Sequence, residues 1–145
     1  LTPRFMAVAM DEVQIKPSPI WLQALLTRIG IKPINNIVDS TNYLAYLTGQ
    51  PLHAYDYDKV AQKSSRGAEL VVRYPEKGEQ VDLLNRKQII PRSEAIMIAT
   101  DKELIGVVGV MGGTETEVDD QTTKIILICI ASGAPAWRMV CLPRL

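Results

Sequence analysis

The sequence predicts an α+β fold in which a few helices are layered on mostly antiparallel sheets. Two segments between residues 18 and 49 carry hydrophobic residues at helical spacing, and from residue 68 onward short strand-like segments alternate with turns. The chain has 145 residues, of which 47% are hydrophobic, which is enough for one core and too little for two independent domains. We therefore expect residues 1–145 to form a single domain.

The first element is a predicted strand over residues 4–10 with hydrophobic side chains on both faces. This pattern is typical of a strand covered on both sides, so we expect an inner strand.

A helix is expected next, with Ser18 as its N-cap, Pro19 at its first position and Gly30 at its end. We expect this helix to bury its hydrophobic stripe against a sheet, and Leu25→Ala to cost roughly 2 to 5 kcal/mol. The stripe consists of Trp21, Leu22, Leu25, Leu26 and Ile29. A second helix should begin near Asn35 or Asn36, where a side-chain amide can cap it, and end at Gly49.

The sequence of the second half of the chain predicts a meander of short antiparallel strands. The last predicted strand is a continuous run of hydrophobic residues. Residues 61–67 are interpreted as a surface loop. The predicted strands cover residues 69–74, 80–84, 88–90, 95–99, 104–110 and 124–131.

Polar groups able to perform chemistry gather between residues 34 and 58. Thr41, Asn42 and His53 offer a hydroxyl, an amide and the chain's single imidazole, which together can orient a water or an ester carbonyl. The alternative is that His53, next to Pro51 and Leu52, is a half-buried packing or capping residue, and residue types alone favour that reading.

Gly112 and Gly113 follow a predicted strand and could leave main-chain amides free for a ligand. Taken alone the pair indicates a turn, because it lacks the context of a nucleotide-binding fingerprint. The acidic residues that follow alternate with Thr and Val and are interpreted as a solvated turn, not a metal site: Glu115, Glu117, Asp119 and Asp120.

Charge and cysteine content narrow the functional classes. Sixteen basic residues balance sixteen acidic ones, so the chain lacks the positive surface of an autonomous nucleic-acid binder. Cys129 and Cys141 form no disulfide framework or metal-ligand spacing, which favours a reducing, cytoplasmic compartment. No membrane span or signal peptide is expected, and the missing initiator Met suggests a fragment of a longer protein.

Four segments resemble phenylalanyl-tRNA synthetase beta subunits, in the module that carries the post-transfer editing site. The segments PSPIWLQALLTRIGIKPINN, PINNIVDSTNY, GQPLHAYDYDKV and GVVGVMGGTETEV occur in the family's order, and the resemblance runs from about Arg4 to about Ile128. It implies layered sheets with helices outside, and hydrolysis of tRNA mischarged with tyrosine.

The resemblance also implies roles for individual residues. His53, Thr41 and Asn42 match the catalytic group, in which His53 binds or orients a water. Substrate-binding positions are matched by Pro51, Leu52, Met111, Gly112, Gly113 and Cys129. No metal or cofactor is implied for this domain, whereas the whole synthetase uses ATP and Mg. The implied partners are tRNA(Phe) and the alpha subunit, in an assembly of two alpha and two beta chains.

One position departs from the family pattern. Cys129 stands where the family has the glutamate implied to recognise the tyrosine hydroxyl, and the tail retains only Pro135 and Trp137 of the expected pattern. Three explanations of this departure are open. The protein has diverged with loss of editing, the sequence is damaged or shifted near its C-terminus, or the register assigned between Cys129 and the family pattern is displaced. The alternatives to editing are therefore a structural or tRNA-binding module of the beta subunit and a free-standing deacylase.

Overall fold

The computed structural model describes residues 4–131. The predictions for Cys141, Pro135 and Trp137 therefore lie outside the described residues. Within them, the elements are β1 (Arg4–Met10), α1 (Ile20–Arg28), α2 (Asn36–Thr48), β2 (Leu52–Asp56), α3 (Tyr57–Gln62), β3 (Val71–Arg73), β4 (Val81–Asp82), β5 (Gln88–Ile89), β6 (Met97–Ala99), β7 (Leu104–Val107), β8 (Met111–Gly112), the 3₁₀ turn η1 (Thr114–Thr116) and β9 (Ile125–Ala131).

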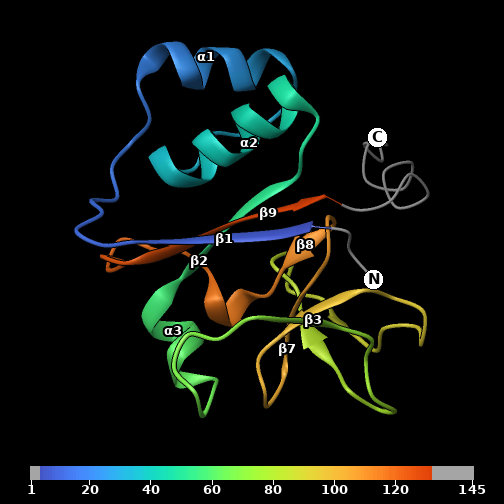
Figure 1. The fold of residues 1–145 in the computed structure, drawn as a ribbon. Coiled ribbons are helices and arrows are strands. Elements are labelled where there is room, and N and C mark those ends of the chain that lie inside the picture. The colour runs from blue at the N-terminus through green and yellow to red at the C-terminus, as the bar shows by residue number, and fades with distance from the viewer. Residues whose placement is uncertain (1–3, 132–145) are drawn as a thin grey trace.

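The elements form three layers, which confirms the predicted α+β class (Figure 1). The middle layer is the antiparallel sheet β1-β9-β2. Helices α1 and α2 lie on one side of it, and the antiparallel sheet β3-β6-β7-β8 lies on the other (Figure 1). The main core fills the space between the sheets and contains Tyr55, Val60, Ile98, Ile105, Ile126, Ile128 and Ile130.

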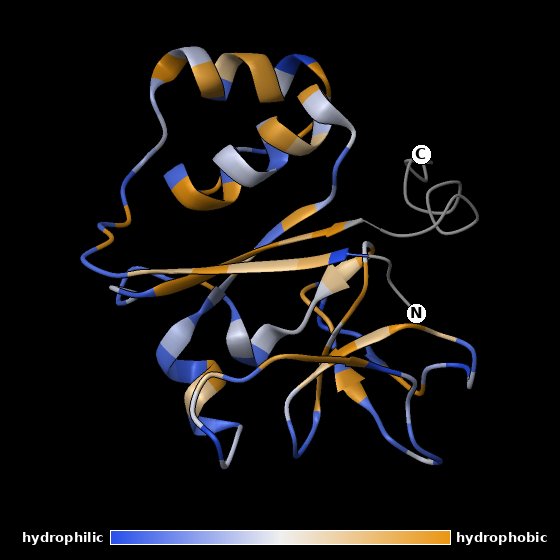
Figure 2. Ribbon diagram, in the orientation of Figure 1, coloured by the Kyte–Doolittle hydropathy of each residue, from blue (hydrophilic) through white to orange (hydrophobic). Residues whose placement is uncertain are grey.

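The first strand is an edge strand, so the prediction of an inner strand is wrong. β1 pairs only with β9, and β9 also pairs with β2, which makes β9 the inner strand. Met6, Val8 and Met10 are exposed. Most of β1 nevertheless has hydrophobic colours in Figure 2, as the buried strand β9 does. Hydrophobicity on both faces therefore did not distinguish a covered strand from an uncovered one.

The first helix differs from its prediction at both its start and its buried face. Ser18 does not cap α1; its hydroxyl donates to Asp39 Oδ2 at 2.5 Å, and Pro19 occupies the cap position without a side-chain hydrogen bond. Leu22 and Leu26 are buried. Trp21, Leu25 and Ile29 are exposed, because α1 is the outermost layer and packs on α2 instead of a sheet (Figure 1).

The second helix is confirmed. The Asn35 side chain accepts hydrogen bonds from the main-chain N–H of Ile37 and Val38 at 3.1 and 2.9 Å, and thus caps α2. Gly49 ends the helix with a φ of 71°, a left-handed conformation that costs glycine little.

The six predicted strands of the second half are present but shorter, and they do not form one meander. The β4-β5 pair separates from the sheet, so β3 is joined directly to β6. Three elements were missed: β2, α3 and β8. The predicted loop over residues 61–67 is only partly a loop, because α3 extends to Gln62. Among the described residues, every helix is too short or too polar to cross a bilayer.

Candidate functional site

A cleft of about 640 Å³ lies beside the free edge of β2. It lies between α2 and the turn that joins β7 to β8. Its lining includes Thr41, Asn42, Pro51, Leu52, His53, Met111 and Gly112, together with Ile34, Val38, Ala45, Tyr46, Gly49, Ala54, Tyr55, Leu84, Ile98, Val107, Gly109, Val110, Glu117, Val118, Ile128 and Ile130.

Strand β2 presents both its side chains and its main chain to this cleft. Tyr57 N donates to Lys124 O at 3.0 Å, and hydrogen-bonded pairs alternate along an antiparallel ladder. His53 and Tyr55 therefore bond to β9, whereas the N–H and C=O groups of Leu52 and Ala54 point to the free edge. Residues from both faces of β2 line the cleft, so this edge opens into it.

The His53 imidazole lies in the cleft in an uncharged state. Burial disfavours the charged ring and lowers its pKa from 6.5 to about 4. The ring meets Tyr55 edge-on, with 4.6 Å between ring centroids. Within residues 4–131 neither ring nitrogen has a protein hydrogen-bond partner. One nitrogen can therefore donate to a ligand or water while the other accepts.

Gly112 allows the imidazole to occupy this place. A Cβ atom built on Gly112 would lie 2.3 Å from His53 Nε2, so only glycine fits without displacing the ring. The sequence linked these two residues only through the family resemblance, because they lie far apart in the chain.

Gly113 does not line the cleft. Its N–H donates to Ile105 O at 2.7 Å, so the expectation of a free amide at this position is wrong. Gly113 instead borders a small separate cavity together with Lys63 and Glu115.

Cys129 is also absent from the lining, whereas Ile128 and Ile130 contribute to it. Cys129 lies on the inner strand between Met6 and Leu52, and alternation places its side chain on the opposite face from its two neighbours. Thr41 does line the cleft, but its hydroxyl donates to Val38 O at 2.7 Å within the helix. Toward a ligand, this oxygen can therefore act only as an acceptor.

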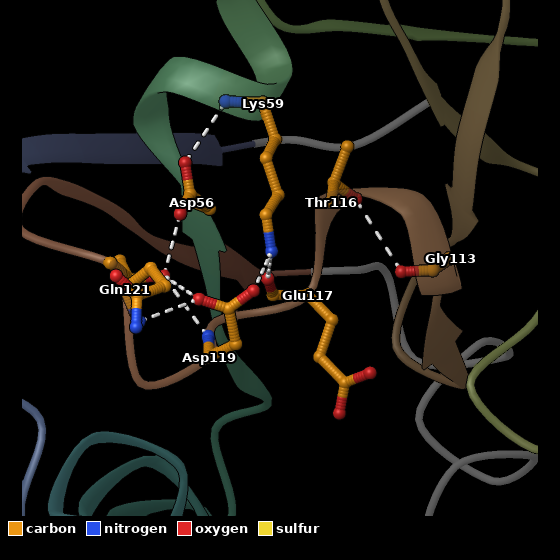
Figure 3. A network of polar contacts seen from close by, with 8 residues as sticks. Asp56, Lys59, Gly113, Thr116, Glu117, Asp119 and Gln121 are labelled. Atoms are coloured by element: carbon orange, nitrogen blue, oxygen red, sulfur yellow. Dashed lines mark hydrogen bonds and ion pairs between the residues drawn. The ribbon is translucent and has the colours of Figure 1, made fainter.

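Lys59 of α3 holds the acidic segment after η1 (Figure 3), and Lys63, directly after α3, holds η1 itself. Lys59 pairs with Asp119 at 2.6 Å, and Lys63 pairs with Glu103 at 2.9 Å and with Glu115. Among the described residues, no group of three or more potential ligands is arranged for a metal ion.

The prediction of a solvated turn is confirmed for this segment, since Glu115, Glu117, Asp119 and Asp120 are exposed. Exposed Glu117 also lines the cleft, which the sequence did not indicate. Its neighbours Thr116 and Val118 are buried. No feature of the sequence distinguished Glu117 from the other acidic residues of this segment.

Known proteins resemble this chain over nearly its full length. The B3/4 domain family matches residues 1–135. The chain is 42% identical over 127 residues to a phenylalanine–tRNA ligase beta subunit of Carboxydothermus hydrogenoformans, covering 88% of this chain and 15% of that protein. It is 39% identical over 125 residues to the corresponding subunit of Bacillus cereus, covering 86% and 15%. The chain thus spans about 15% of the length of these relatives.

A solved structure supports the same architecture. An N-terminal fragment of the phenylalanyl-tRNA synthetase beta-subunit from Pyrococcus horikoshii superposes with a TM-score of 0.63 at 9% identity, covering 92% of this chain and 40% of that one. At this identity the likeness concerns the fold alone.

Proposed function

The chain belongs to the B3/4 domain family, and from this premise we propose that it is the editing module of a phenylalanine–tRNA ligase beta subunit. In this proposal the cleft beside β2 receives the aminoacylated 3′ end of a mischarged tRNA(Phe). The observation that supports it most is the arrangement of Thr41, Asn42 and His53 around one cleft, with Gly112 directly against the imidazole.

The proposed reaction is hydrolysis of the aminoacyl ester. A water attacks the ester carbonyl carbon, the bond from that carbon to the ribose oxygen breaks, and a water proton is transferred to that oxygen. The products are the free amino acid and uncharged tRNA. With a pKa of about 4, neutral His53 is a weak base at pH 7, so it serves to hold and orient the water. Asn42 and the Thr41 oxygen complete the set of hydrogen-bonding groups.

The remaining activities belong to the proposed larger protein. In the cytoplasm, the beta subunit would assemble with an alpha subunit as two alpha and two beta chains, and charging of tRNA would use ATP and Mg outside this domain. The whole assembly would then be the ligase, and this domain would remove its errors.

The second candidate function is a structural or tRNA-binding module without editing. The sequence basis for it is Cys129, which stands where the resemblance implies a glutamate that recognises the tyrosine hydroxyl. Cys129 lies outside the cleft lining, so this position supplies no such group to the cleft. In a site that lacks a side chain to hydrogen-bond the tyrosine hydroxyl, binding of phenylalanine leaves no buried polar group unpaired. Such a site discriminates poorly between tyrosine and phenylalanine.

Deacylation of purified Tyr-tRNA(Phe) and Phe-tRNA(Phe) by the 145-residue protein distinguishes the two candidates. The editing proposal predicts hydrolysis of both, with less than about a tenfold preference for tyrosine. It also predicts that His53→Ala slows the reaction at least about tenfold. The exposed variant Arg92→Ala, remote from the cleft lining, is the control. Tight tRNA binding without hydrolysis by the unaltered protein would support the second candidate instead.

A further inference from the structure

Glu117 gives the cleft a single formal charge. Among the described residues that line the cleft, it is the only Asp, Glu, Lys or Arg. Its main chain is anchored on both sides, since its N–H donates to Thr114 O at 3.3 Å and its carbonyl accepts from Lys59 Nζ at 2.7 Å. Its carboxylate is bound to none of the described residues, and in Figure 3 the side chain extends away from Lys59 without a marked contact.

The nearby cations do not neutralise this carboxylate. Lys59 is paired with Asp119 at 2.6 Å, and Lys63 is shared by Glu103 and Glu115. A charged group that lies in a cleft, and whose local counter-ions pair with other residues, is suited to a ligand of opposite charge.

The other polar groups of the cleft favour the same kind of ligand. The carbonyl groups of Leu52 and Ala54 point to the free edge of β2 and can accept hydrogen bonds. His53 is neutral at pH 7 and adds no positive charge. A cleft whose single charge is a carboxylate, and which also offers main-chain acceptors, is complementary to an ammonium group, which carries three donors and one positive charge.

We propose that Glu117 binds the α-ammonium group of the aminoacyl ester. This inference rests on the proposed editing function and adds a selectivity to it. The site accepts aminoacyl ends with a free amine, and it rejects ends whose amine is blocked by an acyl group, such as peptidyl or formylated ones. Glu117 is thus a specificity-determining residue that contacts the ligand next to the reacting ester.

Calorimetric titration with three probes tests the proposal on the 145-residue protein. Puromycin joins an O-methyltyrosine with a free amine to a modified adenosine through a stable amide, N-acetylpuromycin lacks the ammonium, and adenosine lacks the amino acid. At pH 6.5 an α-amine is mostly protonated while the His53 ring stays neutral. Glu117→Gln keeps the side-chain shape and removes its charge. Glu115→Gln is the matched control, two positions away in the same segment and outside the cleft lining.

The proposal predicts that the unaltered protein and Glu115→Gln bind puromycin at least about tenfold more tightly than N-acetylpuromycin. In Glu117→Gln this preference should fall to less than about twofold through weaker binding of puromycin alone. A preference that persists in Glu117→Gln would overturn the proposal, as would an equal loss of adenosine affinity, which would assign Glu117 to the base. Equal binding of both puromycins by the unaltered protein overturns the Glu117 role but leaves the cleft as a binding site. Absence of all binding overturns both this role and the proposed function.

Discussion

His53 and Gly112 together define the geometry of the cleft at the scale of single residues. The imidazole is held against a backbone segment that tolerates no Cβ atom, and burial keeps it neutral. Neither condition could be deduced from residue types, which favoured a packing role for this histidine. In the structure the half-buried ring does pack, on Tyr55 and against Gly112, and it also lines the cleft that Thr41 and Asn42 line.

Burial of His53 should make the fold less stable in mild acid. Its pKa is lowered from 6.5 to about 4 in the fold, so the unfolded chain takes up the proton first. The resulting stability is present above pH 6.5 and is lost as the pH falls toward 4. Between pH 7 and 5 the unaltered protein should lose about 1 to 2 kcal/mol more than His53→Gln. Urea denaturation at the two pH values measures this, and identical losses in the two proteins would show that the ring is not desolvated.

Gly112→Ala should act through His53. The added methyl would lie 2.3 Å from Nε2 and force the ring to move, which should cost roughly 1 to 3 kcal/mol of unfolding free energy. In a His53→Ala background the obstacle is gone, and the same change should cost less than about 1 kcal/mol. A double-mutant cycle from denaturation curves gives the coupling. Equal costs in the two backgrounds would mean that the ring and the glycine do not meet.

At the scale of elements, the two helices show what hydrophobic periodicity predicts and what it does not. The helical stripe of residues 21–29 correctly predicted a helix, but its position in the outermost layer leaves only Leu22 and Leu26 buried. Spacing specifies which residues share a face and not which partner covers that face. The α2 prediction succeeded because its ends depend on local chemistry, the Asn35 cap and the Gly49 turn.

The two neighbouring leucines of α1 should therefore respond differently to truncation. Leu26 is 0% exposed, and Leu26→Ala should cost roughly 2 to 5 kcal/mol. Leu25 is 41% exposed, and Leu25→Ala should cost less than about 1 kcal/mol, which replaces the larger cost expected from the sequence. Chemical denaturation of the Leu25→Ala and Leu26→Ala variants shows which of the two leucines is buried. A greater loss for Leu25→Ala would mean that α1 is rotated relative to the described packing.

Loss of the α2 cap should lower the stability of the fold. Asn35→Ala removes the acceptor of two main-chain N–H groups and should cost about 1 kcal/mol. Asn35→Asp keeps an acceptor at this position and should retain most of the stability. Thermal unfolding of both variants measures the difference, and equal melting temperatures for Asn35→Ala and the unaltered protein would argue against the cap.

At the scale of the whole molecule, the cleft depends on segments that only the tertiary fold brings together. Sequence patterns predicted the α+β class, helix α2 and the continuous hydrophobic strand that is β9 in the structure. They could not predict that β2 is an edge strand, since that depends on long-range pairing with β9. For the same reason they could not separate Gly112 from Gly113, exclude Cys129 from the lining, or bring Glu117 into it.

The central claim is that the cleft beside β2 receives the aminoacyl end of tRNA, and mapping of amide chemical shifts during a puromycin titration tests it most directly. We expect the largest changes in α2 near Thr41 and Asn42, along Leu52–Asp56, and around Gly112. The amides of α1 should remain unchanged, because no residue of that helix lines the cleft. Changes concentrated on α1 or on the exposed strand β1, with β2 and Gly112 unaffected, would contradict the claim.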